Sequence, residues 1–136
     1  MRKMVLALVG GVALFLAGAP LWAHHAFAAE FDADKPVKIR GTVVKWELIN
    51  PHSWLQIDAK DEEGKVTTWR FEGPPPNTLF RLGFTKDALP PGTEVIVEGY
   101  QAKDGSTRAS GKSVTFPDGR SLMLGLVTGA DGKPGK

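Results

Sequence analysis

The sequence predicts a mainly β protein, a small closed or partly open OB-like barrel of five to six strands with one short helix between strands 3 and 4. Three observations predict this fold. Apolar and polar residues alternate along several short segments after residue 36, and turn residues such as Gly, Pro, Asn and Asp separate these segments. A Pro-rich stretch with a helical pattern follows the third segment. A flattened half-barrel or sandwich is the alternative fold.

Residues 1–23 are predicted to be a signal peptide rather than a part of the barrel. Arg2 and Lys3 form a basic start, residues 4–16 are continuously apolar, and small residues with Pro20 follow. The apolar run is shorter than the roughly 20 residues that a membrane-spanning helix needs. We therefore expect signal peptidase and the export machinery to deliver a periplasmic or secreted protein with no stable membrane span. An uncleaved anchor is the alternative.

Two peptide bonds fit cleavage of this signal. Cleavage after Ala23 makes His24 the first mature residue, whereas cleavage after Ala28 follows a better small-x-small pattern but lies far beyond the apolar run. We favour Ala23. The predicted organisation is then a signal peptide at 1–23, an N-terminal arm at 24–36, the barrel at 37–127 and a flexible tail at 128–136.

The first predicted strand, residues 37–48, is long and bent. Apolar residues occupy odd positions in its first half and even positions in its second half. A β-bulge produces such a phase shift within one strand, and Gly41 gives the backbone freedom to bend nearby. Asn50-Pro51 is turn chemistry, so we expect the strand to end before it.

The second and third predicted strands form a hairpin. Within residues 52–60, Leu55 and Ile57 share one face, and the polar residues with Trp54 share the other. Asp61-Glu-Glu-Gly64 is a turn, and residues 65–72 alternate again as the third strand.

After this hairpin the pattern becomes helical. A run of three prolines follows Gly73, Asn77 is a good N-cap, and Gly83 suits the position after a helix C-terminus. Further strands are predicted at residues 94–102, 109–116 and 121–126. Three strands, a helix, and two or three strands are the order of an OB barrel, whose closure removes exposed strand edges.

Six short motifs carry a resemblance to a known family. They are His24-His-Ala-Phe27, Ala29-Glu-Phe-Asp32, Asn50-Pro-His52, residues 69–72, Pro91-Gly92 and Val97-Glu-Gly-Tyr100. In this order and spacing they resemble domain-of-unknown-function family 6152, a group of small secreted bacterial proteins. The resemblance implies export and a compact β-barrel-like domain, and it implies no activity. It also favours a mature protein that keeps the two adjacent histidines.

Metal binding is the first functional hypothesis. A mature N-terminal His24 offers its α-amine and its imidazole together, which is a chelate suited to Cu(II) or Ni(II). His25 adds a second imidazole, and His52 is expected at the exposed rim of the first hairpin. We predict a divalent transition-metal site, with copper preferred, formed by His24, His25 and His52, with Glu30 and Asp32 as nearby oxygen donors. Alternatively, the histidine pair is solvated and His52 only hydrogen-bonds the Asn-Pro turn.

Ligand binding on the barrel surface is the second hypothesis. OB barrels often bind oligonucleotides or oligosaccharides across their second and third strands, and Trp54 is a candidate stacking residue there. Nucleic acid is disfavoured by charge. The 17 Lys and Arg residues include Arg2 and Lys3, so the mature chain has as many bases as acids, 15 of each.

Catalysis has the least support. No motif joins an acid, a base and a nucleophile, so we predict no enzyme and no catalytic residue. The chain has no cysteine, which excludes disulfides and thiolate chemistry. A non-catalytic interaction or accessory protein of the bacterial envelope, without a metal, is the remaining alternative.

Overall fold

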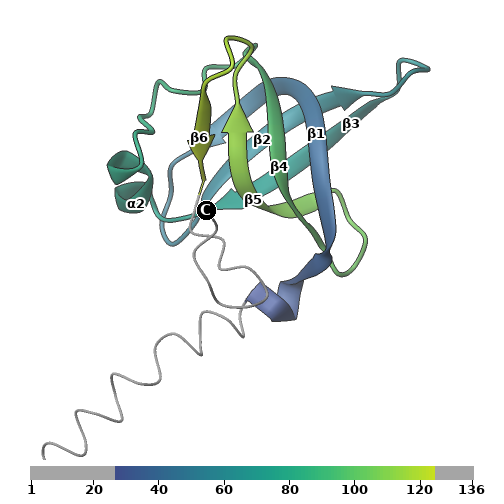
Figure 1. Ribbon diagram of the computed structural model, residues 1–136, viewed down its shortest axis with the longest axis horizontal. Helices are drawn as coiled ribbons and strands as arrows, with labels where there is room; N and C mark the ends of the chain where they lie inside the picture. The colour runs from purple at the N-terminus through teal and green to yellow at the C-terminus, as the bar shows by residue number, and fades with distance from the viewer. Residues whose placement is uncertain (1–26, 125–136) are drawn as a thin grey trace, which may run out of the picture. The chain divides into compact units, whose positions relative to one another are not determined.

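In the computed structural model the described residues are 27–124 (Figure 1). The predicted signal peptide, His24, His25 and the predicted tail lie outside them. Residues 27–30 are helical, and the strands follow. The first strand, β1 (Phe31–Glu47), pairs along its first half with β4 (Glu94–Ala102) and along its second half with β2 (Ser53–Lys60). One long curved strand thus belongs to both sides of the sheet.

The predicted bulge in β1 is confirmed. The register with β2 shifts between Val43 and Lys45, where the apolar pattern changes phase. Gly41 lies just before the shift, and a Cβ atom there would lie 2.6 Å from the backbone oxygen of Asp58. Only glycine allows the two strands to approach so closely at this bend.

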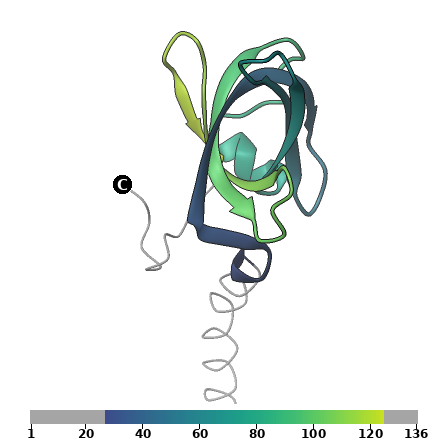
Figure 2. The same ribbon diagram turned by 90° about the vertical axis from the view of Figure 1, so that its right-hand side faces the viewer.

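The remaining pairings close the sheet into a barrel. β3 (Val66–Gly73) pairs antiparallel with β2 and parallel with β5 (Arg108–Thr115), which in turn pairs with β4. The ring order β1-β2-β3-β5-β4 is that of an OB barrel, so the predicted fold class is confirmed (Figure 2). A short sixth strand, β6 (Ser121–Met123), pairs with the last part of β5.

The first strand of the barrel begins six residues earlier in the chain than the sequence predicts. The sequence predicted Val37 as the first strand residue, whereas β1 begins at Phe31, which is buried and pairs with Ala102. Polar residues and Pro36 interrupt the alternation between these two positions. β4 pairs with Phe31 and again from Pro36 onward, so it holds both ends of this irregular segment, which a local pattern does not reveal.

The helix α2 (Pro76–Arg81) lies between β3 and β4, as predicted, but its N-cap differs. Pro75 is the N-cap residue, no side chain caps the helix, and Asn77 lies inside the first turn. The predicted cap at Asn77 is therefore wrong. A proline at the first helical position has its φ angle already set for the helix, so the helix begins before Asn77. Gly83 has a positive φ of 93°, as expected after a helix.

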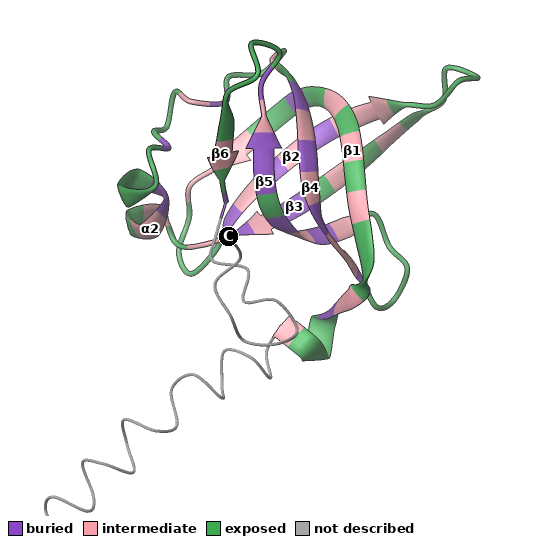
Figure 3. Ribbon diagram, in the orientation of Figure 1, coloured by how far each residue is buried: buried purple, intermediate pink, exposed green. Residues whose placement is uncertain are grey.

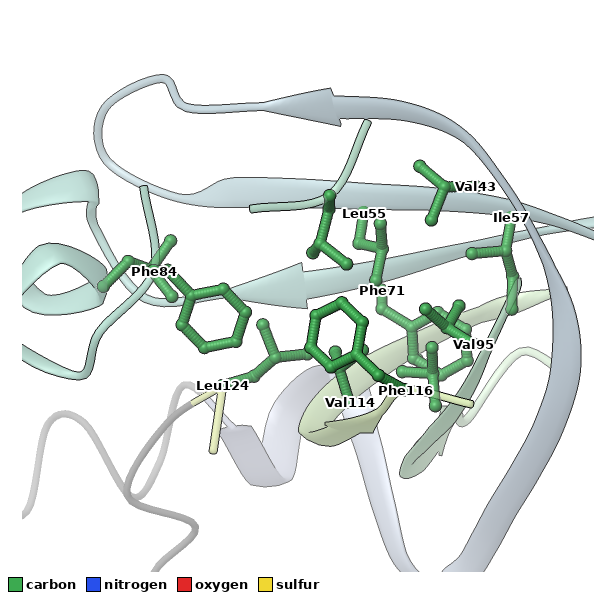
Figure 4. Close-up of a cluster of buried hydrophobic side chains, with 13 residues drawn as sticks. Val43, Leu55, Ile57, Phe71, Phe84, Val95, Val114, Phe116 and Leu124 are labelled. Carbon is green, nitrogen blue, oxygen red and sulfur yellow. The ribbon is translucent and has the colours of Figure 1, made fainter. Parts of the chain in front are cut away.

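The core fills the interior of the barrel and extends under α2. Burial alternates along the strands, so that one face of each strand is inside (Figure 3). Figure 4 shows the side chains that meet there, among them Leu55, Ile57, Phe71 and Phe84. Each contributes roughly 1.5–3 kcal/mol by leaving water. This packing fixes which side chains of β2 and β3 face outward.

Candidate functional site

The outer face of the β2–β3 hairpin carries polar and aromatic side chains that point away from the core. The antiparallel register places Trp54 opposite Glu72 and Gln56 opposite Arg70. We call His52, Trp54, Arg70 and Glu72 the β2–β3 face. The turn at Asp61 fixes this register, because its carboxylate accepts hydrogen bonds from the backbone N–H groups of residues 63 and 65 at 3.0 and 2.8 Å.

His52 lies at the end of this face, where the cis Asn50–Pro51 bond leads into β2. Its imidazole is about half exposed, and its Nδ1 lies 3.1 Å from Oε1 of Glu72, whose side chain is only 16% exposed. The exposed position predicted for His52 is therefore confirmed. When an imidazole carries its hydrogen on Nδ1 and a carboxylate lies beside that atom, the Nε2 lone pair is free for a ligand.

Ser53 holds this end of the hairpin in place. Its side chain is fully buried, its Oγ donates to the backbone oxygen of Pro74 at 2.8 Å, and its backbone N–H donates to the same oxygen at 3.2 Å. These bonds tie the start of β2 to the end of β3, so His52 and Glu72 are held near each other. The sequence analysis missed Ser53, although its position in phase with Leu55 and Ile57 indicates an inward side chain.

Trp54, the predicted stacking residue, has its ring partly covered. The guanidinium carbon of Arg70 lies 4.6 Å from the ring centre, which is a cation–π contact. Trp54 is half-buried and Arg70 is exposed. The surface offered to a ligand on that side of the indole is therefore the arginine, which the sequence analysis did not identify.

Within residues 27–124, no group of three or more His, Cys, Asp or Glu side chains is placed to hold a metal ion. His52 and Glu72 supply one candidate ligand and its support. Of the predicted oxygen donors, Glu30 is exposed, and Asp32 accepts the backbone N–H of Asp34 at 3.0 Å. His24 and His25 lie outside the described residues, so the predicted set of three histidines stays a prediction.

Two carboxyl groups outside this face have a lowered pKa. Hydrogen bonds from Ser106, its side chain first, lower the pKa of Asp104. The backbone N–H and then the side chain of Arg120 lower the pKa of Asp118. Each aspartate stabilises its own turn, between β4 and β5 or between β5 and β6, so these shifts report turn structure rather than a ligand site.

Fold and face together define a class of protein, a small OB-like barrel with a polar, histidine-containing surface on its second and third strands. The chain belongs to the Family of unknown function (DUF6152), whose model matches residues 13–112. The matched range includes His24, His25 and His52.

Comparison with curated proteins and with solved structures gives no match. In the described part of the chain, no helix has the length and apolar character needed to cross a membrane.

Proposed function

We propose that the mature protein is an exported binding module that holds a divalent transition metal, preferably copper, between its N-terminal histidines and the barrel. The contact between His52 and Glu72, 3.1 Å from Nδ1 to Oε1, carries the proposal. Histidines that bind metals commonly donate their second ring N–H to a carboxylate, which fixes the ring and makes the other nitrogen a better ligand. An exposed histidine with a carboxylate beside its Nδ1 is suited to binding a metal through Nε2.

The other donors come from the start of the mature chain. Cleavage after Ala23 gives His24 a free α-amine next to its imidazole, and two nitrogen donors on one residue suit Cu(II). His25 supplies a second imidazole. Copper is preferred over harder ions because the proposed donors are nitrogens, whereas Mg²⁺ and Ca²⁺ prefer oxygen ligands.

The barrel and the N-terminal residues are both needed in this proposal. No third donor joins His52 and Glu72 within residues 27–124, so the barrel by itself has one histidine ligand to offer. One imidazole binds a metal ion weakly, whereas a chelate from His24 with His52 as an additional ligand binds it tightly. Loss of either part is therefore expected to weaken binding.

The test is a titration of the exported protein with Cu(II), followed by calorimetry. His52→Ala is expected to weaken binding by about tenfold or more, the scale of effect found at metal-binding histidine sites. A variant that retains a methionine before His24 is expected to lose nearly all tight binding, because the α-amine is no longer on the histidine. His52→Ala removes an exposed side chain, so thermal unfolding serves as the control for folding.

Tight binding that stays unchanged in both variants would contradict the proposal. Absence of any specific copper uptake by the wild-type protein would also contradict it and would favour an interaction protein of the envelope.

A further inference from the structure

Three neighbouring side chains on the outer surface of β2 and β3 have N–H groups without a partner in the described part of the chain. Gln56 lies directly opposite Arg70 across the hairpin, and Trp54 lies two residues from Gln56 on the same face of β2. Within residues 27–124, the amide of Gln56 and the indole N–H of Trp54 form no hydrogen bond, and Arg70 forms no ion pair.

These polar groups lie at the surface. Trp54 and Gln56 are half-buried and Arg70 is exposed. In the described residues, every side-chain nitrogen or oxygen that is shielded from water has a hydrogen-bond partner. The unpaired groups of Trp54 and Gln56 are therefore not shielded, and water or a ligand completes their hydrogen bonding.

The three side chains stand on a rigid part of the barrel. Behind them Leu55, Ile57 and Phe71 are fully buried in the core, which fixes the backbone of both strands. The guanidinium carbon of Arg70 lies 4.6 Å from the centre of the Trp54 ring, and this cation–π contact restrains both side chains. A surface that is ordered before a ligand arrives loses less conformational entropy when it binds.

Charges of both signs surround these donors. The strand register places Glu47 on β1 and Glu72 on β3 opposite Trp54. Lys45 lies opposite Gln56, and its Nζ is 2.6 Å from Oε1 of Glu47. A strongly anionic or strongly cationic ligand would meet like charges here. An apolar ligand would leave the polar groups without partners.

We propose that Trp54, Gln56 and Arg70 bind a neutral oligosaccharide on the outer surface of β2 and β3. A sugar hydroxyl both donates and accepts hydrogen bonds, so it can pair with the N–H groups and with the carboxylates of this mixed surface. Oligosaccharides bind other OB barrels across the second and third strands, where this site lies. The site uses neither His52 nor the N-terminal histidines, so it goes beyond the proposed copper site and does not depend on it.

Two other classes of ligand fit this surface less well. A peptide that binds by adding a strand needs a free strand edge. Here β2 is paired with β1 and β3, and β3 is also paired with β5 at Arg70. Single-stranded nucleic acid needs a continuous basic groove with several aromatic platforms. Glu47 and Glu72 interrupt the basic residues, and Trp54 is the single aromatic side chain beside them.

The test is a titration of the exported full chain with maltohexaose, cellohexaose and triacetylchitotriose, followed by calorimetry and NMR. A sugar that binds is expected to shift the side-chain N–H signals of Trp54 and Gln56. Trp54→Ala is expected to weaken binding by about tenfold or more, as for an aromatic residue at the centre of an interface. Gln56→Ala is expected to weaken it by about threefold to tenfold, the loss typical of a hydrogen-bonded amide.

The matched controls are on α2. Phe80→Ala removes an exposed aromatic ring and Asn77→Ala an exposed amide, and neither is expected to change sugar binding. Thermal unfolding of each variant checks that it folds. Because Gln56→Ala removes a smaller side chain, it tests the site even if Trp54→Ala is unstable.

Neutral-sugar binding that falls in Trp54→Ala and Gln56→Ala, but not in the controls, supports the proposal. Absence of binding by all three neutral sugars, or binding that both variants leave unchanged, would overturn it. Tighter binding of trigalacturonate than of every neutral sugar would overturn it in favour of an acidic ligand. Tighter binding of a single-stranded oligonucleotide at the same salt concentration would overturn it in favour of nucleic acid.

Discussion

The two faces of the β2–β3 hairpin differ in what their side chains do: the inner face packs into the core, and the outer face carries polar and aromatic residues at the surface. On the inner face Leu55, Ile57 and Phe71 are fully buried and pack into one cluster. On the outer face Trp54 and Arg70 form a cation–π pair, and His52 lies beside Glu72. Because side chains alternate along a strand, the outward Trp54 lies between Ser53 and Leu55, which are both fully buried.

This difference separates stability from recognition. Inner residues contribute through burial, which depends on volume and shape more than on chemical identity. Outer residues contribute little to folding, because exposed ion pairs are worth about 0–1 kcal/mol. The identity of these outer residues is therefore little constrained by folding and can be determined by the ligand that they bind. Substitutions on the two faces should have separable effects, and the following predictions test this.

The largest effect is expected on the inner face, with Phe71→Ala. Phe71 is fully buried, so its removal leaves a cavity, and the free energy of unfolding should fall by about 3–5 kcal/mol. Phe80→Ala is the matched control, because Phe80 is 52% exposed on α2 and its loss should cost less than about 1 kcal/mol. Urea denaturation measures both. Similar losses for the two variants would show that the core is not where the packing places it.

An intermediate effect is expected on the outer face, with Glu72→Gln. This variant keeps the side-chain shape but removes the charge that supports His52, so copper affinity should fall by about tenfold. Because the Glu72 side chain is only 16% exposed, thermal unfolding of the variant is measured alongside, which separates a loss of affinity from a loss of stability. Glu47→Gln is the control, because Glu47 pairs with Lys45 rather than with a histidine. Calorimetry that finds equal copper affinity in Glu72→Gln and the wild type would remove Glu72 from the site.

The smallest effect is expected outside both faces, at Asp118. Its pKa lies below the ordinary value of 3.8, because the N–H groups of Arg120 stabilise its charged form in the folded protein. The folded state therefore gains stability from this group above the ordinary value and loses it as the pH falls further. Asp118→Asn should show a slightly shallower loss of stability between about pH 5 and pH 2. Identical pH profiles of thermal unfolding would contradict this role.

Much of the fold could be predicted because the chain alternates clearly. The phase shift in residues 37–48 predicted the bulge between Val43 and Lys45, and the strand at Glu94–Ala102 has the predicted bounds. Two features depend on distant partners and have no local signal. The start of β1 at Phe31 pairs with Ala102 of β4, and the parallel contact of β3 with β5 closes the barrel.

The candidate site was only partly predictable for the same reason. Alternation around Leu55 and Ile57 predicts that His52 and Trp54 face outward, which agrees with their exposure. Their partners Glu72 and Arg70 lie on the next strand, and the sequence analysis assigned neither of them a role in a site. Counting residues outward from the Asp61 turn places Trp54 opposite Glu72, so the hairpin register was the signal that identifies these partners.

The most direct test of the copper proposal is native mass spectrometry of the exported protein. One spectrum reports both the first residue of the mature chain and any metal that remains bound to it. The account predicts a chain that begins at His24 and carries one copper ion, with a lower copper occupancy in His52→Ala at the same copper concentration. A chain that begins at Ala29, or a chain that begins at His24 and carries no metal after copper is supplied, would contradict it.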